Sequence, residues 1–378
     1  NTSRACKGGR DMKRMMGLVC TNYSGSDFGM LTEERPVASI PFGGRYRLVD
    51  FPLSNMVNSG INTVGLITPY MYRSLLDHVG NGKAWSLSRK VGGMFILPGS
   101  VYGIKNSHGK FLLRDVIHNQ AYLERSRRDI VVVTASSKIY NIDFREVAEQ
   151  HEKSGAVITL LYKRIPDGGA VRDLNIACDS RGRVTGIHNA APGESCQFMD
   201  AMLIDRELLL KFVEWYSTLG YLDMMEIIQE NLDKLAVFGY EFKGYMRAID
   251  NAADYMAASM DLLEPQVMQE LFLGERHIST KIQDAPPVKY FPGCQVHNSI
   301  IATGCMIRGT VENSIIFRSC TVEEGAVVRN SIIMPNDVIS KGAQLENVIC
   351  DKFVTIGEGV RLYGSALRPL IVTKKQYS

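Results

Sequence analysis

Over the first two-thirds of the chain, short apolar runs alternate with amphipathic helical patterns. The runs are apolar on both faces, which is typical of strands buried in a parallel sheet; they cover residues 15–20, 62–68, 129–136 and 156–163. The helical patterns cover about residues 70–79, 112–126, 144–154, 206–217 and 223–235. This alternation predicts an α/β domain with a mostly parallel sheet, flanking helices and right-handed crossovers. Ligands of such sheets bind at the carboxyl ends of the strands, so we expect a site in the loops after Cys20 and Val133.

The last third of the chain has a different pattern, in which short aliphatic residues and glycines recur roughly every six positions. The tetrapeptide Asn-Ser-Ile-Ile occurs at residues 298–301, 313–316 and 330–333, and a weaker copy occupies residues 347–350. Spacings of 15, 17 and 17 residues allow about three six-residue units per copy, which is the pattern of a hexapeptide β-helix. An ordinary β-meander is the alternative, but the recurrence of one tetrapeptide argues against it. We therefore predict a left-handed parallel β-helix that begins near Pro286-Pro287, where the prolines break any helix.

These patterns divide the 378 residues into two domains, as expected for a chain that is long for a single core. We place the α/β domain at residues 12–285 and the β-helix domain at residues 286–378. Met12 resembles a natural start, so residues 1–11 are expected to be an artificial addition to the chain.

Composition and charge exclude several classes of protein. The net charge is only +3 and no basic stripe is present, so no nucleic-acid partner is expected. No window approaches the ~18 apolar residues of a transmembrane helix, and no membrane partner is expected. The eight cysteines include no C-x-x-C pair, which argues against a zinc or redox motif. Free thiols suit a reducing compartment, so we expect a cytoplasmic protein.

A long motif, PFGGRYRLVDFPLSN at residues 41–55, is followed by NSGI at residues 58–61. Together with the β-helix, these segments resemble the ADP-glucose pyrophosphorylase (glucose-1-phosphate adenylyltransferase) family of bacterial glycogen synthesis. The likeness runs from Met12 to about residue 370 and implies a Rossmann-like nucleotidyltransferase domain. It also implies a reaction in which glucose 1-phosphate attacks the α-phosphorus of ATP, giving ADP-glucose and pyrophosphate. Positioning and charge neutralisation carry most of such a reaction.

The chain departs from the family where phosphate would be bound. Asn22 and Tyr23 stand at two glycines of the family's G-G-x-G-x-R-L loop, only Gly25 is kept, and Asp27 stands at the arginine. A carboxylate ~4 Å from a phosphate repels it by roughly 4 kcal/mol per charge pair at an effective dielectric of about 20. Asp27 is either a metal ligand or a turn residue of a decayed loop. In the next family motif, R-A-K-P-A-V, Val37 stands at the lysine and cannot donate to a phosphate.

The magnesium carboxylates of the family are missing as well. Ser137 stands at the aspartate of the family's G-D-H-I-Y, and Ala248 stands at the aspartate of W-R-D-V-G-T. Magnesium prefers carboxylate ligands, so we expect no metal site. Asp250 lies two residues beyond Ala248 and is conceivable as a shifted ligand, whereas Lys138 beside Ser137 argues against a cation.

The sugar and nucleotide pockets of the family also have no counterpart. The family's F-V-E-K-P is absent from residues 184–189, and its G-T-A-D reads Phe-Leu-Leu-Arg at residues 111–114. Losses at the loop, the lysine, the metal and the sugar are coherent, and they match the D-type regulatory subunit of the family. The resemblance therefore implies a non-catalytic or weakly catalytic chain without a cofactor. Magnesium is expected only in a catalytic partner subunit, which joins this chain in a heterotetramer; a homo-oligomer is the other possible assembly.

Two arginines that the chain keeps are candidates for effector binding. Arg35 and Arg47 match family positions near the activator site between the domains, where two arginines can grip a sugar phosphate, sulfate or phosphate. Interdomain salt bridges are the equally weighted alternative. Asp223, which opens a helical pattern, is expected to be a helix N-cap.

Two other functions stay open. The chain is an active adenylyltransferase if rearranged ligands such as Asp27 or Asp250 serve in catalysis. A β-helix acyltransferase is the less favoured hypothesis, because such enzymes need a histidine beside a coil and the β-helix has only His297, at its first turn.

Overall fold

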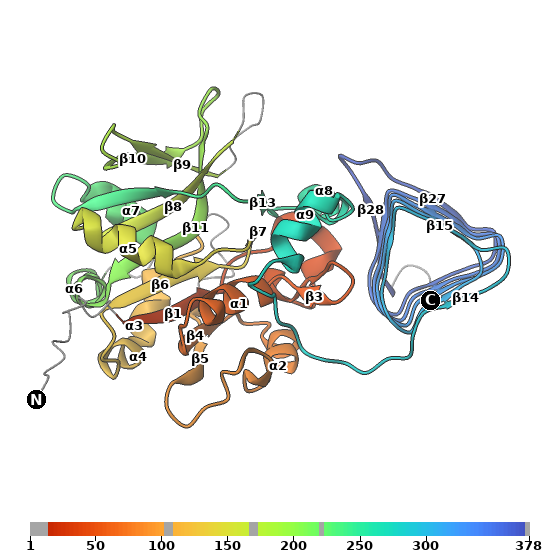
Figure 1. The fold of residues 1–378 in the computed structure, drawn as a ribbon, viewed down its shortest axis with the longest axis horizontal. Coiled ribbons are helices and arrows are strands. Elements are labelled where there is room, and N and C mark those ends of the chain that lie inside the picture. Colours follow the sequence, from red (N-terminus) through yellow and green to blue (C-terminus); the bar gives the residue numbers. More distant parts are fainter. Residues whose placement is uncertain (1–13, 102–108, 166–172, 219–222, 375–378) are drawn as a thin grey trace, which may run out of the picture.

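The computed structural model describes residues 14–101, 109–165, 173–218 and 223–374 of the protein, so Met12 and the predicted addition at residues 1–11 lie outside the described residues. An α/β domain lies beside a coil that is triangular when seen end-on (Figure 1). The connecting chain follows η5 (Gln269–Leu273) and leads into the first strand of the coil, β14 (Lys289–Tyr290). The boundary predicted at residue 286 falls within this connection.

The α/β domain is built on a nine-stranded sheet in the order β10-β9-β11-β6-β1-β4-β5, with β8 pairing to both β11 and β12. The neighbours β1, β4, β5 and β6 run parallel, as the apolar runs predict. In contrast, β11 runs antiparallel to β6 and β8; a buried antiparallel strand has the same apolar run, so periodicity did not reveal it. The bounds are β1 Met15–Cys20, β4 Thr63–Thr68, β5 Gly93–Pro98, β6 Ile130–Ala135, β8 Ile158–Arg164, β9 Leu174–Cys178, β10 Val184–Asn189, β11 Cys196–Asp205 and β12 Val237–Glu241.

Helices cover the sheet, and most lie where the pattern places them. The pattern at 112–126 divides in two at Asn119, whose side-chain amide donates to the carbonyl of Asp115 at 2.8 Å and so competes with a continuous helix. Asp223 is the N-cap of α7, as predicted, with its carboxylate accepting the Met225 N–H. The helices are α1 Asp50–Asn58, α2 Arg73–Val79, α3 Leu113–His118, α4 Gln120–Glu124, α5 Phe144–Ser154, α6 Arg206–Trp215, α7 Met224–Glu230, α8 Ala252–Asp261 and α9 Pro265–Met268, with short 3-10 turns η1 Ser26–Thr32, η2 Val37–Ser39 and η3 Lys83–Trp85. In the part of the chain that the structure describes, no helix has the length and apolar character to cross a membrane.

Two small strand pairs lie outside the nine-stranded sheet. The family-like motif forms a hairpin of β2 (Pro41–Phe42) and β3 (Tyr46–Arg47). Its turn needs the two glycines, because Gly43 and Gly44 both have positive φ angles, 57° and 80°. A second antiparallel pair joins β7 (Lys138–Tyr140) to β13 (Met246–Ala248) just beyond the end of β6.

The predicted left-handed β-helix is present, with three parallel five-stranded sheets as its faces. Each face stacks one strand from every coil, and the short aliphatic residues of the six-residue pattern fill the interior. The faces are β14, β17 Met306–Ile307, β20 Thr321–Val322, β23 Val338–Ile339 and β26 Thr355–Ile356; β15 Gln295–His297, β18 Thr310–Glu312, β21 Val327–Arg329, β24 Gln344–Glu346 and β27 Arg361–Tyr363; and β16 Ile300–Ile301, β19 Ile315–Ile316, β22 Ile332–Ile333, β25 Val348–Cys350 and β28 Leu370–Val372.

The repeated tetrapeptide forms one corner of the coil. Its asparagines have positive φ angles of 40–54°, a conformation that asparagine tolerates better than most residues. The serine that follows accepts a backbone N–H from the next coil at 3.1 Å, as Ser299 does from Ser314 and Ser331 does from Val348. The Asn-Ser pair therefore shapes the corner and links successive coils, which explains why it recurs.

The two domains share one apolar cluster. Tyr255 of α8 and Leu271 of η5 belong to it on the α/β side, and Phe317 and Met334 belong to it on the β-helix side. Figure 1 shows α8 and α9 on the side of the α/β domain that faces the coil. The β-helix is thus packed against the domain and not merely tethered to it.

Candidate functional site

The loop after β1, where the family resemblance places phosphate contacts, is filled by its own side chains. Asn22 is buried, and its amide donates to the Ser100 carbonyl at 2.8 Å and to the Asp115 carboxylate at 2.9 and 3.1 Å. The hydroxyl of Tyr23 bonds to Ser136 Oγ at 2.8 Å, and burial raises the pKa of this phenol to about 12. A glycine loop offers bare backbone N–H groups to a phosphate, whereas here two side chains bind the loop to the domain.

The rest of this loop is packed rather than open. Gly25 lies against Val37 and Thr32, and a Cβ on Gly25 would come within 2.8 Å of a Val37 methyl carbon. The one glycine that the chain keeps therefore serves packing at this position. Asp27 is exposed in the first turn of η1.

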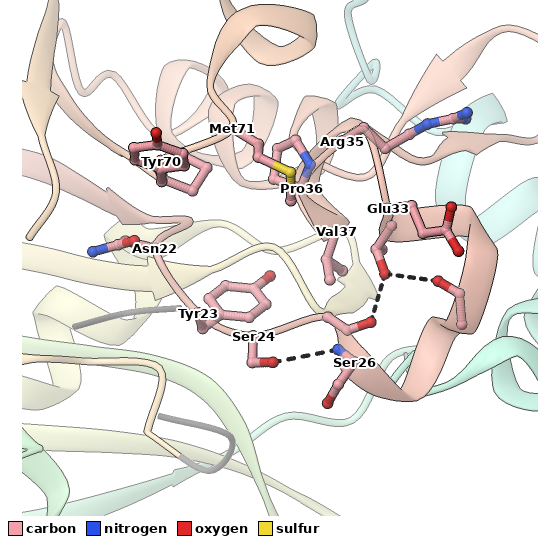
Figure 2. A pocket seen from close by; sticks show the side chains of 14 residues that line it. Asn22, Tyr23, Ser24, Ser26, Glu33, Arg35, Pro36, Val37, Tyr70 and Met71 are labelled. Atoms are coloured by element: carbon pink, nitrogen blue, oxygen red, sulfur yellow. Dashed lines mark hydrogen bonds between the residues drawn. The ribbon is translucent and has the colours of Figure 1, made fainter. Parts of the chain in front are cut away.

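A pocket of ≈ 260 Å³, the loop pocket, lies beside the loop. Figure 2 shows Tyr23 and Val37 facing into it, whereas the guanidinium of Arg35 points away. Thr32 Oγ1 donates to the Gly25 carbonyl at 2.6 Å and closes the turn beneath it. The walls are largely apolar and include Tyr23, Pro36, Val37, Pro69, Tyr70 and Met71. Among the described residues that line the loop pocket, Arg35 is the one cation, and its guanidinium is directed elsewhere, so no cationic side chain would meet a phosphate placed there.

The two positions that correspond to the family's metal-binding aspartates, Ser137 and Ala248, lie close together and carry no carboxylate. Ser137 follows β6, and its hydroxyl donates to Asp200 Oδ2 at 2.8 Å. Ala248 ends β13 and is paired with Lys138. The two positions therefore lie side by side, and Ser137 contacts a cluster of charged side chains.

This charge cluster consists of Lys110, Lys138, Asp173, Asp200 and Asp250. Lys110 Nζ lies 3.1 Å from Asp173 Oδ2, 2.8 Å from Asp200 Oδ2 and 3.2 Å from Asp250 Oδ1. Lys138 Nζ lies 3.1 Å from Asp200 Oδ1 and donates to the Phe198 carbonyl at 2.7 Å. Burial disfavours the charge on Lys110, but the three carboxylates outweigh it and raise the pKa of Lys110 well above its usual value. Burial likewise opposes ionisation of Asp200, yet the two lysines lower the pKa of Asp200 to about 2.

An irregularity in β11 directs Asp200 into this cluster. The register of β11 against β8 shifts between Phe198 and Met202, and Asp200 has a positive φ of 50°. Such a bulge re-aims a side chain. Sequence reasoning identified Lys138 and Asp250 but missed Lys110, Asp173 and Asp200. One signal was available, because an aspartate within an apolar strand must have a partner.

Arg35 and Arg47 occupy different environments between the domains. Arg35 is 9% exposed, and its guanidinium binds Asp351 of the β-helix, with 2.6 Å to Oδ1. This ion pair attaches residues 35–40, the segment that corresponds to the family's R-A-K-P-A-V, to the β-helix. Arg47 instead donates to the Ser74 carbonyl at 2.6 Å and lines a separate pocket.

That separate pocket, the interdomain pocket, has a volume of ≈ 330 Å³ and is lined from both domains. Four cationic residues line it, Arg45, Arg47, Arg318 and Lys352, whereas Asp284 is its one acidic residue within the described ranges. Burial lowers the pKa of Arg47 to about 10, although Asp50 opposes this shift. Burial and then the nearby arginines, Arg47 among them, lower the pKa of Lys352 to about 7. A lysine whose pKa is depressed by neighbouring cations indicates a local excess of positive charge, which favours an anion. Arg45 lies in the motif that was identified; Arg318 and Lys352 were missed because only the fold brings them to Arg47.

His297 and Asp223, which the sequence also singled out, lie outside the loop pocket, the interdomain pocket and the charge cluster. His297 is exposed on β15 in the first coil. Asp223 accepts the Phe111 N–H at 2.9 Å in addition to capping α7, and burial raises the pKa of Asp223 to about 6. Over the described ranges, no three His, Cys, Asp or Glu side chains are arranged to hold a metal ion.

Comparison with known proteins agrees with this architecture. A family model described as "Nucleotidyl transferase" matches residues 24–187, and one described as "GlmU-like, C-terminal hexapeptide" matches residues 288–364. Glycogen biosynthesis protein GlgD of Bacillus subtilis is 36% identical over 362 residues, which cover 96% of each chain. GlgD of Geobacillus stearothermophilus is 36% identical over 315 residues, 83% of each chain. Glucose-1-phosphate adenylyltransferase of Thermotoga maritima is 30% identical over 327 residues, 84% of this chain and 77% of its own.

The hairpin motif, the two domains and these identities agree with one another. They assign the protein a role related to glycogen synthesis. The chain belongs to the glucose-1-phosphate adenylyltransferase family and, within it, to the group of GlgD glycogen biosynthesis proteins.

Proposed function

We propose that this chain is a non-catalytic or barely catalytic regulatory subunit that raises or tunes the activity of a catalytic glucose-1-phosphate adenylyltransferase chain. The observation that carries the proposal is the loop after β1. Asn22 and Tyr23 occupy it and are hydrogen-bonded to Ser100, Asp115 and Ser136. A triphosphate would have to displace these bonds, and it would gain no cation, since Val37 stands at the basic position.

The metal positions support the same proposal. Magnesium needs free carboxylate oxygens, and Ser137 and Ala248 supply none. The nearest alternative, Asp250, is bound to the ammonium group of Lys110 at 3.2 Å. This contact weakens the hypothesis of an active enzyme with Asp250 as a shifted ligand, which remains the second candidate function. Exposed Asp27 on η1 is not among the residues lining the loop pocket.

The proposed partner is a catalytic chain of the same family, because the described relatives include proteins named glucose-1-phosphate adenylyltransferase. Catalysis and subunit assembly need the same fold, whereas the side chains that react with substrate are a separate set of residues. In this proposal the chain keeps the fold and lacks the reacting side chains. No cofactor of its own is part of the proposal, and magnesium belongs to the partner.

The proposed effector is a phosphorylated sugar or a simple anion such as sulfate or phosphate, bound in the interdomain pocket. Arg45, Arg47, Arg318 and Lys352 supply the charge, and arginine suits phosphate through bidentate contacts. Arg35 has a different part in this proposal. Arg35 lines the loop pocket and binds Asp351, which precedes Lys352 of the interdomain pocket in the sequence. This ion pair therefore connects the two pockets.

Two assays test the function. The purified lone chain is given ATP, Mg²⁺ and glucose 1-phosphate, and we expect little or no ADP-glucose; turnover within about tenfold of an ordinary pyrophosphorylase, typically ~1–10³ s⁻¹ for enzymes, would contradict the proposal. The chain is then co-expressed with a catalytic homologue. We expect co-purification and a changed turnover or activation curve, and a partner whose kinetics are the same with and without this chain would also contradict it.

The effector site is tested in the assembled enzyme with Arg318→Ala. Loss of one pocket cation should move the activation curve to about tenfold higher effector concentration, since a charge-assisted hydrogen bond contributes roughly 1.5 kcal/mol or more. Arg361→Ala is the matched control, because Arg361 is an exposed arginine of the same β-helix outside the interdomain pocket. Equal shifts in both variants would refute the assignment of the pocket.

A further inference from the structure

Magnesium does not fit the site where the family resemblance would place it. The positions Ser137 and Ala248 have no carboxylate, although carboxylates are the ligands that magnesium prefers. Carboxylates are nevertheless close by, since Ser137 Oγ donates to Asp200 Oδ2 at 2.8 Å and Asp250 follows Ala248 by two residues. The partner of these carboxylates is therefore a group other than magnesium.

They bind the ammonium group of Lys110. A lysine ammonium has three N–H donors, and Lys110 Nζ has one carboxylate oxygen of each of Asp173, Asp200 and Asp250 at 2.8–3.2 Å. Each donor thus has a different carboxylate. The side chains of Lys110 and Asp200 are 15% and 3% exposed, whereas those of Asp173 and Asp250 are partly open to water.

The three carboxylates come from three separate parts of the α/β domain. Asp173 precedes β9, Asp200 is the bulged residue of β11, and Asp250 follows β13. Lys110 lies just before α3. Lys138, whose side chain is 1% exposed, binds Asp200 from the other side through Oδ1 at 3.1 Å. Lys138 Nζ also lies 3.4 Å from Asp173 Oδ2, but the ammonium group of Lys110 contacts all three carboxylates. Lys110 therefore joins segments that are distant in the sequence, as a bound divalent ion does when it gathers oxygen ligands.

We propose that the ammonium group of Lys110 is a tethered cation that takes the place of a divalent metal ion in this domain and holds the Asp173, Asp200 and Asp250 segments together. The inference goes beyond the regulatory function, because it concerns how the chain keeps this site folded on its own. It implies that the wild-type chain neither needs nor binds a divalent ion here. As they stand in the described part of the chain, these carboxylates are not arranged to hold a metal ion. We expect them to admit one only when the Lys110 side chain is removed.

Two substitutions of Lys110 distinguish the loss of its positive charge from the loss of its side-chain volume. Lys110→Ala removes the ammonium group and leaves a gap between the carboxylates, whereas Lys110→Met removes the charge but keeps a side chain of similar length in the gap. Both take one of two ammonium partners from buried Asp200, which keeps Lys138 at 3.1 Å, and both remove the ammonium partner of Asp250. Loss of a partner from a buried charge is strongly destabilising. We expect the melting temperature of either variant to fall by roughly 5 °C or more. Lys211→Ala, which removes an exposed lysine of α6, is the matched control and should melt like the wild type.

The probe is Mn²⁺, followed by the loss of its free-ion electron paramagnetic resonance signal and by melting temperature with and without the ion. We expect Lys110→Ala to take up about one Mn²⁺ per chain and to recover most of its lost melting temperature. Lys110→Met should take up none and stay destabilised, and the wild type should take up none. These readouts use the lone chain, so they remain informative even if no catalytic partner is found and the regulatory function fails.

Several results would overturn the inference. One is uptake of about one Mn²⁺ per chain by the wild type, which decides the matter whether or not the variants fold. Another is a melting temperature for both Lys110 variants that equals that of the wild type. A third is a Lys110→Ala chain that stays destabilised in Mn²⁺ to the same degree as Lys110→Met, which would show that Lys110 is an ordinary salt-bridge residue.

Discussion

The most informative single substitution in the β-helix is Asp337→Asn. Asp337 is fully buried, and it follows Cys305 and Cys320 in a column that continues to Val354 in successive coils. Its Oδ1 accepts the Val354 N–H at 2.8 Å, whereas Oδ2 has no hydrogen-bond partner among the described residues. Burial, aided by the nearby charge of Asp351, raises the pKa of Asp337 from 3.8 to about 9. At neutral pH the folded protein therefore holds this carboxyl in its protonated form.

The sign of the pH effect follows from this difference in pKa. Between about pH 4 and pH 9 the unfolded chain has lost the Asp337 proton while the folded chain keeps it, so stability falls as pH rises. Each pH unit in this window corresponds to about 1.4 kcal/mol. From pH 5 to pH 8 the wild type should therefore lose on the order of 4 kcal/mol of unfolding free energy through this one group. Asparagine has nearly the shape of the protonated acid and does not titrate, so Asp337→Asn should lose none of it.

Urea unfolding at pH 5 and pH 8, followed by circular dichroism of the β-strands, measures this difference. Both tryptophans, Trp85 and Trp215, lie in the α/β domain, so their fluorescence reports that domain separately and should respond less. Glu358→Gln, which neutralises an exposed carboxylate of the same β-helix, is the control and should follow the wild type. Parallel stability profiles for Asp337→Asn and the wild type from pH 5 to pH 8 would refute the assignment of a protonated, buried carboxyl.

Three further predictions concern the α/β domain and its junction with the coil. Asp223→Ala removes the N-cap of α7 and the acceptor of the Phe111 N–H; we expect a loss of about 2 kcal/mol in urea unfolding, and a loss no larger than that of Asp223→Asn would contradict it. Arg35→Ala breaks the ion pair with Asp351 and should weaken the activator response of the assembled enzyme, with Asp351→Asn giving a similar change; an unchanged activation curve would defeat this prediction. Sulfate binding, measured calorimetrically, should weaken as pH rises from 6 to 8, because the Lys352 ammonium loses its charge through a pKa of about 7. Lys352→Met should abolish this pH dependence, and an equal dependence in the variant would show that another group titrates.

The sequence was most informative where a pattern repeats or a buried run is long. The β-helix was predictable because each coil reuses the same corner, from Asn298 to Asn347, and the same interior aliphatic positions. The strands β1, β4, β6 and β8 were predictable because their apolar runs have few alternatives. The direction of β11 was not, because pairing direction depends on which strands meet in space and not on the residues of one strand.

For the site, the resemblance indicated which residues differ from the family, but not what replaces their contacts. Ser137 and Ala248 were recognised as positions without a carboxylate, yet the partner of Ser137 is Asp200, whose orientation depends on a bulge. The pairing of Arg35 with Asp351 joins residues 316 positions apart and follows only from how the two domains dock. Contacts of this kind require the assembled fold, because no local pattern carries them.

The hydrogen bonds of Asn22 also bear on how such a chain can change over generations. Its amide serves the buried Asp115 carboxylate and fits so closely that a Cβ on Gly99 would lie 2.6 Å from Nδ2. A mutation of Asn22 to glycine, the residue of the family's loop, would take a donor from Asp115 and destabilise the fold by about 1–3 kcal/mol, before any phosphate contact was made. If the chain is non-catalytic, as proposed, a route toward catalysis would also have to change Val37 and the Lys110 cluster. Each such route would pass through less stable intermediates, so the packing of the present loop is itself a barrier to sequence change.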